Sequence, residues 1–413
     1  MIPNLRFKRE DGTDYPDWKT FCIADLGEFF NGLTGKNSSH FGHGSSQYVQ
    51  YSQVFRNSYI KLHECDNVDV EDSDKQNALK VGDALFTTSS EVADEVAFAS
   101  ILLNKPEVDT YLNSFCFGLR LNSLVAPSFA QYLFRTTIFR KAVYPLAQGS
   151  TRYNVSKKEV GKVKLLIPSV KEQNHMAKSF RILDQKINLL TKKKEALETY
   201  KKGLMQKIFS KEIRFKREDG TDYPEWGIET LDKLCLKCKS GGTPKSTVAE
   251  YYNGNIPFLA ISDMTEQGKY LGSTTKSISE LGIENSASWI VPKQSLIYSM
   301  YASVGFVSIN LIPLATSQAV LNLIVDESIC LTEYLYYWLY QFQKNVHVYV
   351  TTGTQGNLNA QTVKSFKVDL PSVKEQENII LTLSKIDIQI SLMHTQIENT
   401  ATLKKGLLQQ MFV

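Results

Sequence analysis

The chain has 413 residues, a formal net charge of +4, 42% hydrophobic and 11% aromatic residues, and six cysteines. This length allows two or more domains with cores of their own, and no apolar stretch approaches the roughly 18 residues of a membrane span. The net charge is too small to establish a nucleic-acid partner, and scattered cysteines favour reduced thiols over disulfides. The charged N-terminal segment lacks the apolar core of a signal peptide, so we expect a cytoplasmic protein.

Two blocks of sequence occur twice. The string RFKREDGTDYP stands at 6–16 and again at 214–224, each time followed by an acidic residue and a tryptophan. A second block begins PSVKEQ at Pro168 and at Pro371 and aligns without a gap at an offset of 203 residues. The segments between the blocks share little similarity. The chain therefore consists of a duplicated frame that carries two diverged inserts.

The first insert is predicted to be an α+β domain. It is rich in aromatic, β-branched and small polar residues, and glycine-bearing loops occur at NGLTGK (31–36) and QGSTRYN (148–154). Short alternating runs between such loops are typical of strands. Loops of this composition can bring backbone N–H groups, hydroxyls and amides against phosphates or base edges.

The next segment, 161–212, is predicted to form a long helix. Its apolar residues follow a 4-3-4-3 spacing between Met176 and Ile208, interrupted only where Lys194 and Lys201 take seam positions. From residue 168 to 212 there are eleven Lys or Arg against five Asp or Glu, so the positive charge is concentrated in this segment.

The second insert repeats the α+β pattern with different residues. It contains the runs SLIYSM (295–300) and AVLNLIV (319–325) and the loops SGGTPKS (240–246) and TGTQGNLN (352–359). These features predict strands joined by polar loops.

The final segment, 364–413, repeats the heptads of the first helix. Two amphipathic helices can each pack on their own domain, but the gapless duplication and the narrow seam favour an antiparallel coiled coil. Each helix of about 38 residues would be roughly 55 Å long. If the two chain ends lie side by side, the chain closes into a pseudo-circle with the inserts at opposite ends.

The motifs of both inserts resemble one family. GGTPKS, YYNGNIPFLAISDM (251–264), ISELGIENS (278–286) and IYSMYASVG (297–305) closely resemble the target recognition domain of type I restriction-modification specificity subunits. NGLTGK, VGDALFTTSSEVADEV (81–96) and QGSTRYNVS resemble another branch of that domain family. PSVKEQ before a long helix that ends in KKGL and Phe resembles the paired spacer regions. One departure is Ser317-Gln318, where the family often has Asn-Gln.

The resemblance implies an α+β fold with two pseudo-symmetric target recognition domains joined by two long antiparallel coiled-coil helices. The expected boundaries are 1–160 for the first recognition domain, 161–212 for the central spacer helix, 213–363 for the second recognition domain and 364–413 for the C-terminal spacer helix. Each domain would read one half of a bipartite, asymmetric double-stranded DNA target. The helix pair would set the unread gap, because a spacer of roughly 50 Å matches about 15 base pairs.

The resemblance also implies partners. Two modification subunits would grip the frame and, with restriction and translocase subunits, would perform adenine methylation or cleavage. S-adenosylmethionine, ATP and Mg²⁺ would bind those subunits, and we expect this non-catalytic chain to bind no metal or cofactor itself.

Arg152, in a glycine loop, is a candidate for a bidentate contact with guanine or phosphate. The alternative is a surface arginine that contacts nothing. Lys36 and Lys245 suit phosphate, while Tyr48, Tyr298 and Tyr301 are as compatible with core packing as with DNA contact. The full set of candidate DNA-binding residues is Lys36, Tyr48, Ser90, Ser150, Thr151, Arg152, Asn154, Thr243, Lys245, Tyr298, Tyr301, Ser303, Gln318, Thr354, Gln355 and Asn357.

Catalytic motifs are weak in this sequence. The pairs Cys235-x-x-Cys238 and His40-x-x-His43 each lack the second half of a zinc site. GLTGKNS lacks the spacing of a phosphate loop, and no methyltransferase [DN]PP[YF] motif is present. Two alternatives stay open: a coiled-coil scaffold that binds protein partners and a non-nucleic ligand, and a stand-alone nuclease, against which the missing acidic metal motif argues.

Overall fold

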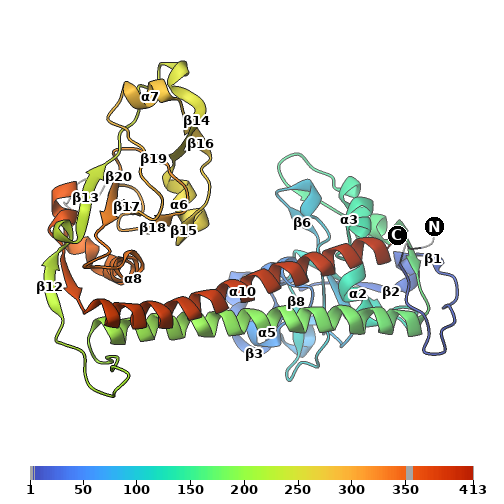
Figure 1. Ribbon diagram of the computed structural model, residues 1–413. Coiled ribbons are helices and arrows are strands. Elements are labelled where there is room, and N and C mark those ends of the chain that lie inside the picture. Colours follow the sequence, from blue (N-terminus) through green and yellow to red (C-terminus); the bar gives the residue numbers. More distant parts are fainter. Residues whose placement is uncertain (1–2, 4, 350–356, 413) are drawn as a thin grey trace. The chain divides into compact units, whose positions relative to one another are not determined.

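The computed structural model describes residues 3, 5–349 and 357–412. The backbone divides into two compact units: unit 1 holds residues 1–191 and 395–413, and unit 2 holds residues 192–394. Each unit contains one α+β domain and a part of each long helix, α5 (Val170–Phe209) and α10 (Val373–Met411) (Figure 1).

Unit 1 is built on a four-stranded antiparallel sheet of order β2-β9-β5-β7. A second sheet has the order β4-β3-β8, with β3 and β8 parallel, and two smaller pairs join β1 to β11 and β6 to β10. The elements are β1 (Lys19–Cys22), β2 (Gly27–Asn31), β3 (Phe41–Val49), α1 (Tyr51–Arg56), β4 (Asp66–Val68), β5 (Asp83–Thr87), β6 (Ser89–Ser90), β7 (Ala99–Ile101), β8 (Thr110–Leu112), β9 (Cys116–Leu121), α2 (Pro127–Leu133), α3 (Thr137–Val143), β10 (Tyr153–Asn154), α4 (Lys157–Lys162) and β11 (Lys164–Ile167).

The core of unit 1 lies around strand β5, all five of whose residues are buried. The ring of Phe86 on this strand lies 5.3 Å from that of Phe117 and 5.1 Å from that of Phe134. Phe129 of α2 stacks on Phe412 at 5.4 Å, so the end of α10 packs on the same core.

Unit 2 contains a five-stranded sheet of order β13-β20-β17-β18-β15, a three-stranded sheet of order β16-β14-β19, and the pair β12-β21. The elements are β12 (Gly227–Thr230), β13 (Cys235–Ser240), β14 (Tyr252–Leu259), α6 (Ile261–Gln267), β15 (Tyr270–Leu271), β16 (Lys276–Ile278), α7 (Glu280–Glu284), β17 (Leu296–Ser299), β18 (Val307–Asn310), β19 (Ala315–Thr316), β20 (Val320–Val325), α8 (Thr332–Phe342), α9 (Ala360–Lys364) and β21 (Lys367–Leu370).

The two domains have the same strand arrangement. Strand β5 pairs antiparallel with β9 and β7, as β17 pairs with β20 and β18. At the outer strand, Ile101 donates its N–H to the Ser58 carbonyl at 3.1 Å, and Ile309 donates its N–H to the Lys269 carbonyl at 2.7 Å. These registers confirm the prediction of two equivalent α+β domains, although the inserts share little sequence.

The helices α5 and α10 pack on each other in antiparallel direction, as predicted. In unit 1, the ring of Phe412 lies 6.1 Å from that of Phe180, and Lys404 forms a 2.5 Å ion pair with Asp184. Contacts further along α5 therefore involve earlier residues of α10, so the two helices run in opposite directions. In unit 2 the corresponding ion pair joins Lys201 to Asp387 at 2.5 Å. The seam lysine of one helix therefore pairs with the repeated aspartate of the other.

Each of these aspartates also accepts a hydrogen bond from the domain packed on the helices. Tyr132 of α2 donates its hydroxyl to Asp184 at 2.8 Å, and Tyr337 of α8 donates its hydroxyl to Asp387 at 2.6 Å. The Tyr–Asp–Lys triplet thus occurs once in each unit. It connects the recognition domain to both helices.

The repeated RFKREDGTDYP segment clasps the start of the long helix that follows. In unit 1, Arg6 donates to Glu172 at 2.8 and 3.0 Å and Trp18 Nε1 donates to the same carboxylate at 3.2 Å. In unit 2, Trp226 Nε1 donates to Glu375 at 3.0 Å. Both carboxylates are fully buried. Because a buried charge must be paired and hydrogen-bonded, both copies of the segment need the same Arg and Trp.

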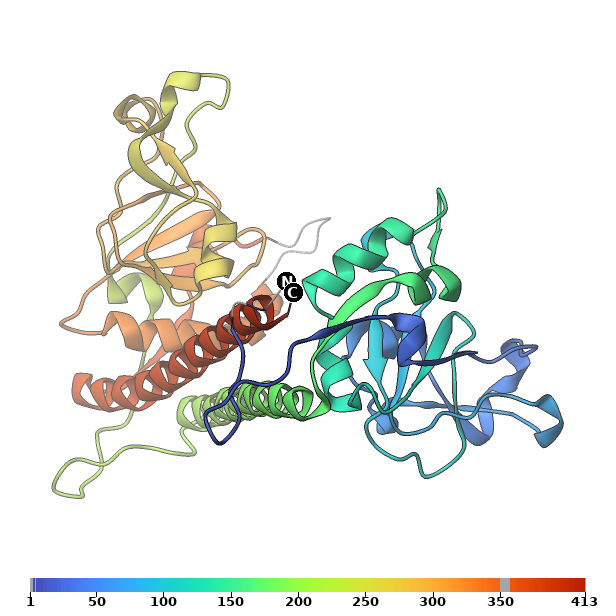
Figure 2. The ribbon, with the colours of Figure 1, turned by 90° about the vertical axis from the view of Figure 1, so that its right-hand side faces the viewer.

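The described residues next to the two chain ends lie side by side in unit 1 (Figure 2). Leu5 donates its N–H to the Gln410 carbonyl at 3.2 Å. In unit 2, where the chain is continuous, Ile213 donates its N–H to the Lys207 carbonyl at 3.1 Å. The expected neighbourhood of the two ends is confirmed.

The predicted domain boundaries stay predictions. The structure places β11 and β21 just after residues 160 and 363, and pairs each with the first strand of its own domain. The helices begin later, at Val170 and Val373.

Candidate nucleic-acid interface

In unit 2, four polar segments of the second insert meet at one end of the central sheet. They are the SGGTPKS loop, the loop after β17, the segment before β20 and the residues around Leu358. Gly241 donates its N–H to the Val320 carbonyl at 3.3 Å, which places the SGGTPKS loop beside the segment before β20. Met300 donates its N–H to the Ala319 carbonyl at 2.9 Å, which joins the loop after β17 to that same segment. The Met300 carbonyl accepts from the Leu358 N–H at 3.0 Å.

Side chains complete this junction in unit 2. Thr243 donates its hydroxyl to Gln318 Oε1 at 2.6 Å, so one predicted residue orients another. A Cβ at Gly241 would lie 1.9 Å from the Thr316 carbonyl oxygen, so only glycine permits this approach. The loop after β17 turns through two left-handed residues, Ala302 at φ 33° and Ser303 at φ 52°.

In unit 1, the same four loops meet at the same end of the sheet. Gly32 donates its N–H to the Cys116 carbonyl at 3.4 Å. Thr88 donates its N–H to the Phe115 carbonyl at 2.9 Å, and its own carbonyl accepts from the Val155 N–H at 2.9 Å. These bonds correspond one for one to those of Gly241, Met300 and Leu358.

Arg152 is an exposed cation at the unit 1 junction. Its guanidinium lies 5.5 Å from the ring centre of Phe115, itself 54% exposed. Gly149 makes this loop possible, because its φ is 132° and a Cβ there would lie 2.2 Å from the Arg152 carbonyl oxygen. An arginine held over an exposed ring by a tight loop presents its donors outward.

The structure brings most of the predicted residues to these two junctions. Exposed at the unit 1 junction are Ser150, Thr151, Arg152 and Asn154, and exposed in the unit 2 loops are Thr243, Lys245, Tyr301, Ser303 and Gln318. Asn357, half-buried, precedes Leu358, and Thr354 and Gln355 lie outside the described residues.

Tyr298, a candidate for either DNA contact or core packing, lies in the core. Its side chain is fully buried in strand β17, its ring lies 6.3 Å from that of Phe366, and burial raises the pKa of its hydroxyl. Strand β17 is buried on both faces, so the run SLIYSM shows no alternation that would distinguish Tyr298 inside it from Tyr301 just after it.

Three further candidates are less available than expected. Lys36 forms a 2.5 Å ion pair with Asp74 and its side chain is only 6% exposed, and this hydrogen bond lowers the pKa of Asp74. Ser90 is buried and donates its hydroxyl to Glu95 at 2.9 Å. Tyr48 is half-buried in a T-shaped contact with Phe41 at 4.8 Å, and burial raises the pKa of its hydroxyl.

Sequence reasoning missed a cationic feature of unit 2. Lys237 and Lys239 are exposed on β13, and their amines lie 4.0 and 5.9 Å from the ring centre of Trp289, which donates to the Ser240 carbonyl. The alternation of lysines in CLKCKS was the available signal. This cluster borders the glycine loop that holds Thr243.

Among the described residues, no group of three or more His, Cys, Asp or Glu side chains is arranged to hold a metal ion. Within the same part of the chain, no helix is long and apolar enough to span a membrane. The junctions therefore offer hydrogen-bond donors, amides and cations rather than metal ligands.

Fold and site together define a duplicated recognition module: one domain type used twice, each copy presenting a loop cluster of its own. A family model for the type I restriction modification DNA specificity domain matches residues 15–199 and 223–403. The chain belongs to this family.

Individual relatives agree with the family model. The chain is 23% identical over 416 residues to the putative type I restriction enzyme MjaX specificity subunit of Methanocaldococcus jannaschii, covering 97% of this chain and 94% of that protein. It is 27% identical over 183 residues to the MjaIX specificity subunit of the same organism, a match that spans 42% of the relative.

Solved structures share the fold. The type I restriction-modification S subunit of M. genitalium superposes with a TM-score of 0.60 at 16% identity, covering 100% of this chain and 99% of that one. A chain from a study of complex assembly in a type I restriction-modification system gives a TM-score of 0.58 at 16% identity, covering 96% and 97%.

Proposed function

We propose that this protein is the DNA sequence-recognition subunit of a type I restriction-modification complex. The observation that carries the proposal is the repeated loop junction, held by the same backbone hydrogen bonds in both domains while its side chains differ. Identical scaffolds with different polar residues suit two different half-sites. The target would accordingly be double-stranded, bipartite and asymmetric.

The chain would act without catalysis of its own. Two modification subunits and the restriction and translocase subunits would supply adenine methylation, translocation and cleavage, together with the S-adenosylmethionine, ATP and Mg²⁺ these reactions need. The assembly would work in the cytoplasm. The amides, hydroxyls and cations of the two junctions suit base-edge and phosphate contacts rather than acid–base chemistry.

Within this proposal the helix pair sets the distance between the half-sites. Helix α5 has 40 residues and α10 has 39, and neither is interrupted in the described residues. At 1.5 Å per residue each helix is about 60 Å long, on the scale of a short bipartite site. A Tyr–Asp–Lys triplet in each unit would keep the helices in register.

The experiment is a genome-wide map of methylated adenines in a host that carries this gene and its modification gene, compared with a deletion of this gene alone. Loss of one split, asymmetric motif is expected. An unchanged methylation pattern would favour the coiled-coil scaffold, because that alternative gives the inserts no DNA to read.

A further inference from the structure

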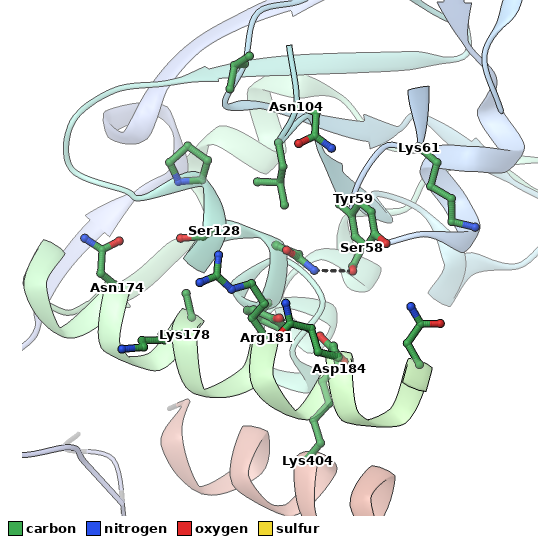
Figure 3. Close-up of a pocket in the computed structure, with 18 residues that line it drawn as sticks. Ser58, Tyr59, Lys61, Asn104, Ser128, Asn174, Lys178, Arg181, Asp184 and Lys404 are labelled. Atoms are coloured by element: carbon green, nitrogen blue, oxygen red, sulfur yellow. Dashed lines mark hydrogen bonds and ion pairs between the residues drawn. The ribbon is translucent and has the colours of Figure 1, made fainter. Parts of the chain in front are cut away.

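Unit 1 contains a large cleft, lined by polar and apolar side chains, between helix α5 and the recognition domain. Its volume is about 1060 Å³. The floor is one face of α5, and the opposite wall includes Ser58, Tyr59 and Ser128 (Figure 3). Figure 3 shows Arg181 rising from α5 into this space.

Two cations on the floor have no partner within the described residues. Lys178 and Arg181, one helical turn apart, make neither a hydrogen bond nor an ion pair there, unlike Lys404, which is paired with Asp184. The amides of Asn174 and Gln185 line the same floor. An open cleft with unpaired positive charge and several amides suits an acidic, hydrogen-bonding peptide segment.

The equivalent place in unit 2 is filled by the chain itself. Lys269 stands where unit 1 has Ser58, because the carbonyl of each accepts an N–H from the equivalent outer strand of its unit. Glu333 stands where unit 1 has Ser128. Lys269 contacts Glu333 at 3.1 Å and the Tyr337 hydroxyl at 2.9 Å, and burial lowers its pKa.

Helix α10 likewise lacks the two cations in unit 2. The repeat places Leu381 and Ser384 at the positions of Lys178 and Arg181. The two unpaired cations on the cleft floor are therefore a feature of unit 1 that the repeat does not place in unit 2.

The position of the cleft argues against DNA as its occupant. Val81 precedes strand β5 and Asn104 follows strand β7, so the cleft lies at the start of β5. The recognition loops lie at the other end of the same strand, after Thr87. Five strand residues separate the two by roughly 17 Å, and DNA bound at the loops would contact the opposite edge of the sheet.

We infer that this cleft binds an acidic segment of one modification subunit, so that the two copies of that subunit are held unequally by the two ends of the chain. The inference rests on the proposed function, in which modification subunits grip the frame, because α5 forms both that frame and the cleft floor. A carboxylate of the segment would pair with Arg181 and Lys178.

The first test neutralises the floor in the complete complex with the modification subunit. In the variant Lys178→Gln with Arg181→Gln, release of one of the two modification subunits should become faster by on the order of tenfold while the other is unchanged. Stepwise dissociation is followed by native mass spectrometry on dilution. The variant Lys192→Gln with Lys193→Gln, which removes the same charge from α5 outside the cleft, should leave both steps unchanged.

A second variant fills the cleft instead of removing charge. Ser58→Lys with Ser128→Glu transfers the unit 2 arrangement to unit 1 at no change in net charge, and should equalise the two dissociation steps. Unchanged dissociation in both cleft variants would overturn the inference, as would an equal effect of the Lys192 and Lys193 control. Loss of DNA affinity with unchanged subunit release would assign the cleft to DNA backbone instead.

The methylated motif separates this inference from the proposed function. Complexes of either cleft variant should methylate the same bipartite sequence as the unaltered protein, because the recognition loops are untouched. If the unaltered chain forms no complex with the modification subunit at all, the proposed function itself fails.

Discussion

Under the proposed function, Arg152 would contact a base of the first half-site. Replacing it by alanine should cost about 1–3 kcal/mol of binding to the cognate first half-site, because a bidentate arginine contact is lost. Affinities of the complex for duplexes with a cognate or a scrambled first half-site measure this. Tyr298→Phe is the matched control, since that hydroxyl is buried; an Arg152→Ala complex that discriminates as well as the unaltered one would refute the role.

The buried carboxylates Glu172 and Glu375, which the repeated RFKREDGTDYP segments contact, should matter for stability more than for recognition. In Glu172→Gln, Arg6 loses its charged partner, and we expect destabilisation by about 2–4 kcal/mol with an unchanged target motif. Thermal melting of the complex tests this, with the exposed Glu10→Gln of the same repeated segment as the control. Equal melting of the two variants would show that the clasp contributes nothing.

At this scale, sequence predicts loops better than individual contacts. The four glycine loops were recognisable because glycine, amides and hydroxyls concentrate in them, and residues that the structure describes in these loops lie at the junctions. Whether a given tyrosine faces solvent depends on the strand's burial on both faces, which separates buried Tyr298 from exposed Tyr301 only three residues away. The partner of Lys36 is likewise set by tertiary folding, 38 residues along the chain.

Among the elements, the long helices were predictable and the sheets were not. A heptad pattern repeated without a gap predicts two helices of equal length, and its narrow seam favours packing of the two on each other. The sheets depend on pairs distant in sequence, such as the parallel pairing of β3 with β8 and of β14 with β19, which local patterns do not encode. The equivalence of the two domains was predictable from the duplicated frame segments and not from the local periodicity of the inserts.

The seam ion pairs give an unequal prediction for the two units. Asp184 has one cationic partner, Lys404, whereas Asp387 has Lys201 at 2.5 Å and Lys269 at 3.7 Å. Lys404→Met should therefore destabilise the protein by about 1–3 kcal/mol, and Lys201→Met by less, because a second cation remains beside the carboxylate.

Thermal unfolding of Lys404→Met and Lys201→Met, each in complex with the modification subunit, measures the difference in destabilisation. Adding Asp184→Asn to Lys404→Met should recover part of the loss, because it removes a half-buried charge that has lost its cation. A larger effect at Lys201 than at Lys404 would contradict the reasoning.

For the whole molecule, the duplicated frame makes the order of the domains in the chain dispensable. The bond from Leu5 to Gln410 at the chain ends repeats the bond from Ile213 to Lys207 within the continuous chain. We therefore expect a circular permutant that begins at Ser210 and joins the present ends to fold and to direct methylation of the same motif. Its melting temperature should fall by only a few degrees, since cutting an exposed connection changes few contacts.

The permutant is tested by mapping methylated adenines in a host that carries it in place of the natural gene. Loss of methylation with an intact complex would show that chain order is needed for recognition. A control permutant cut inside α5, after Lys193, should fail, because it interrupts a helix whose continuity both units share. Success of the first cut and failure of the second would establish that recognition needs continuous helices but not the present order of the domains.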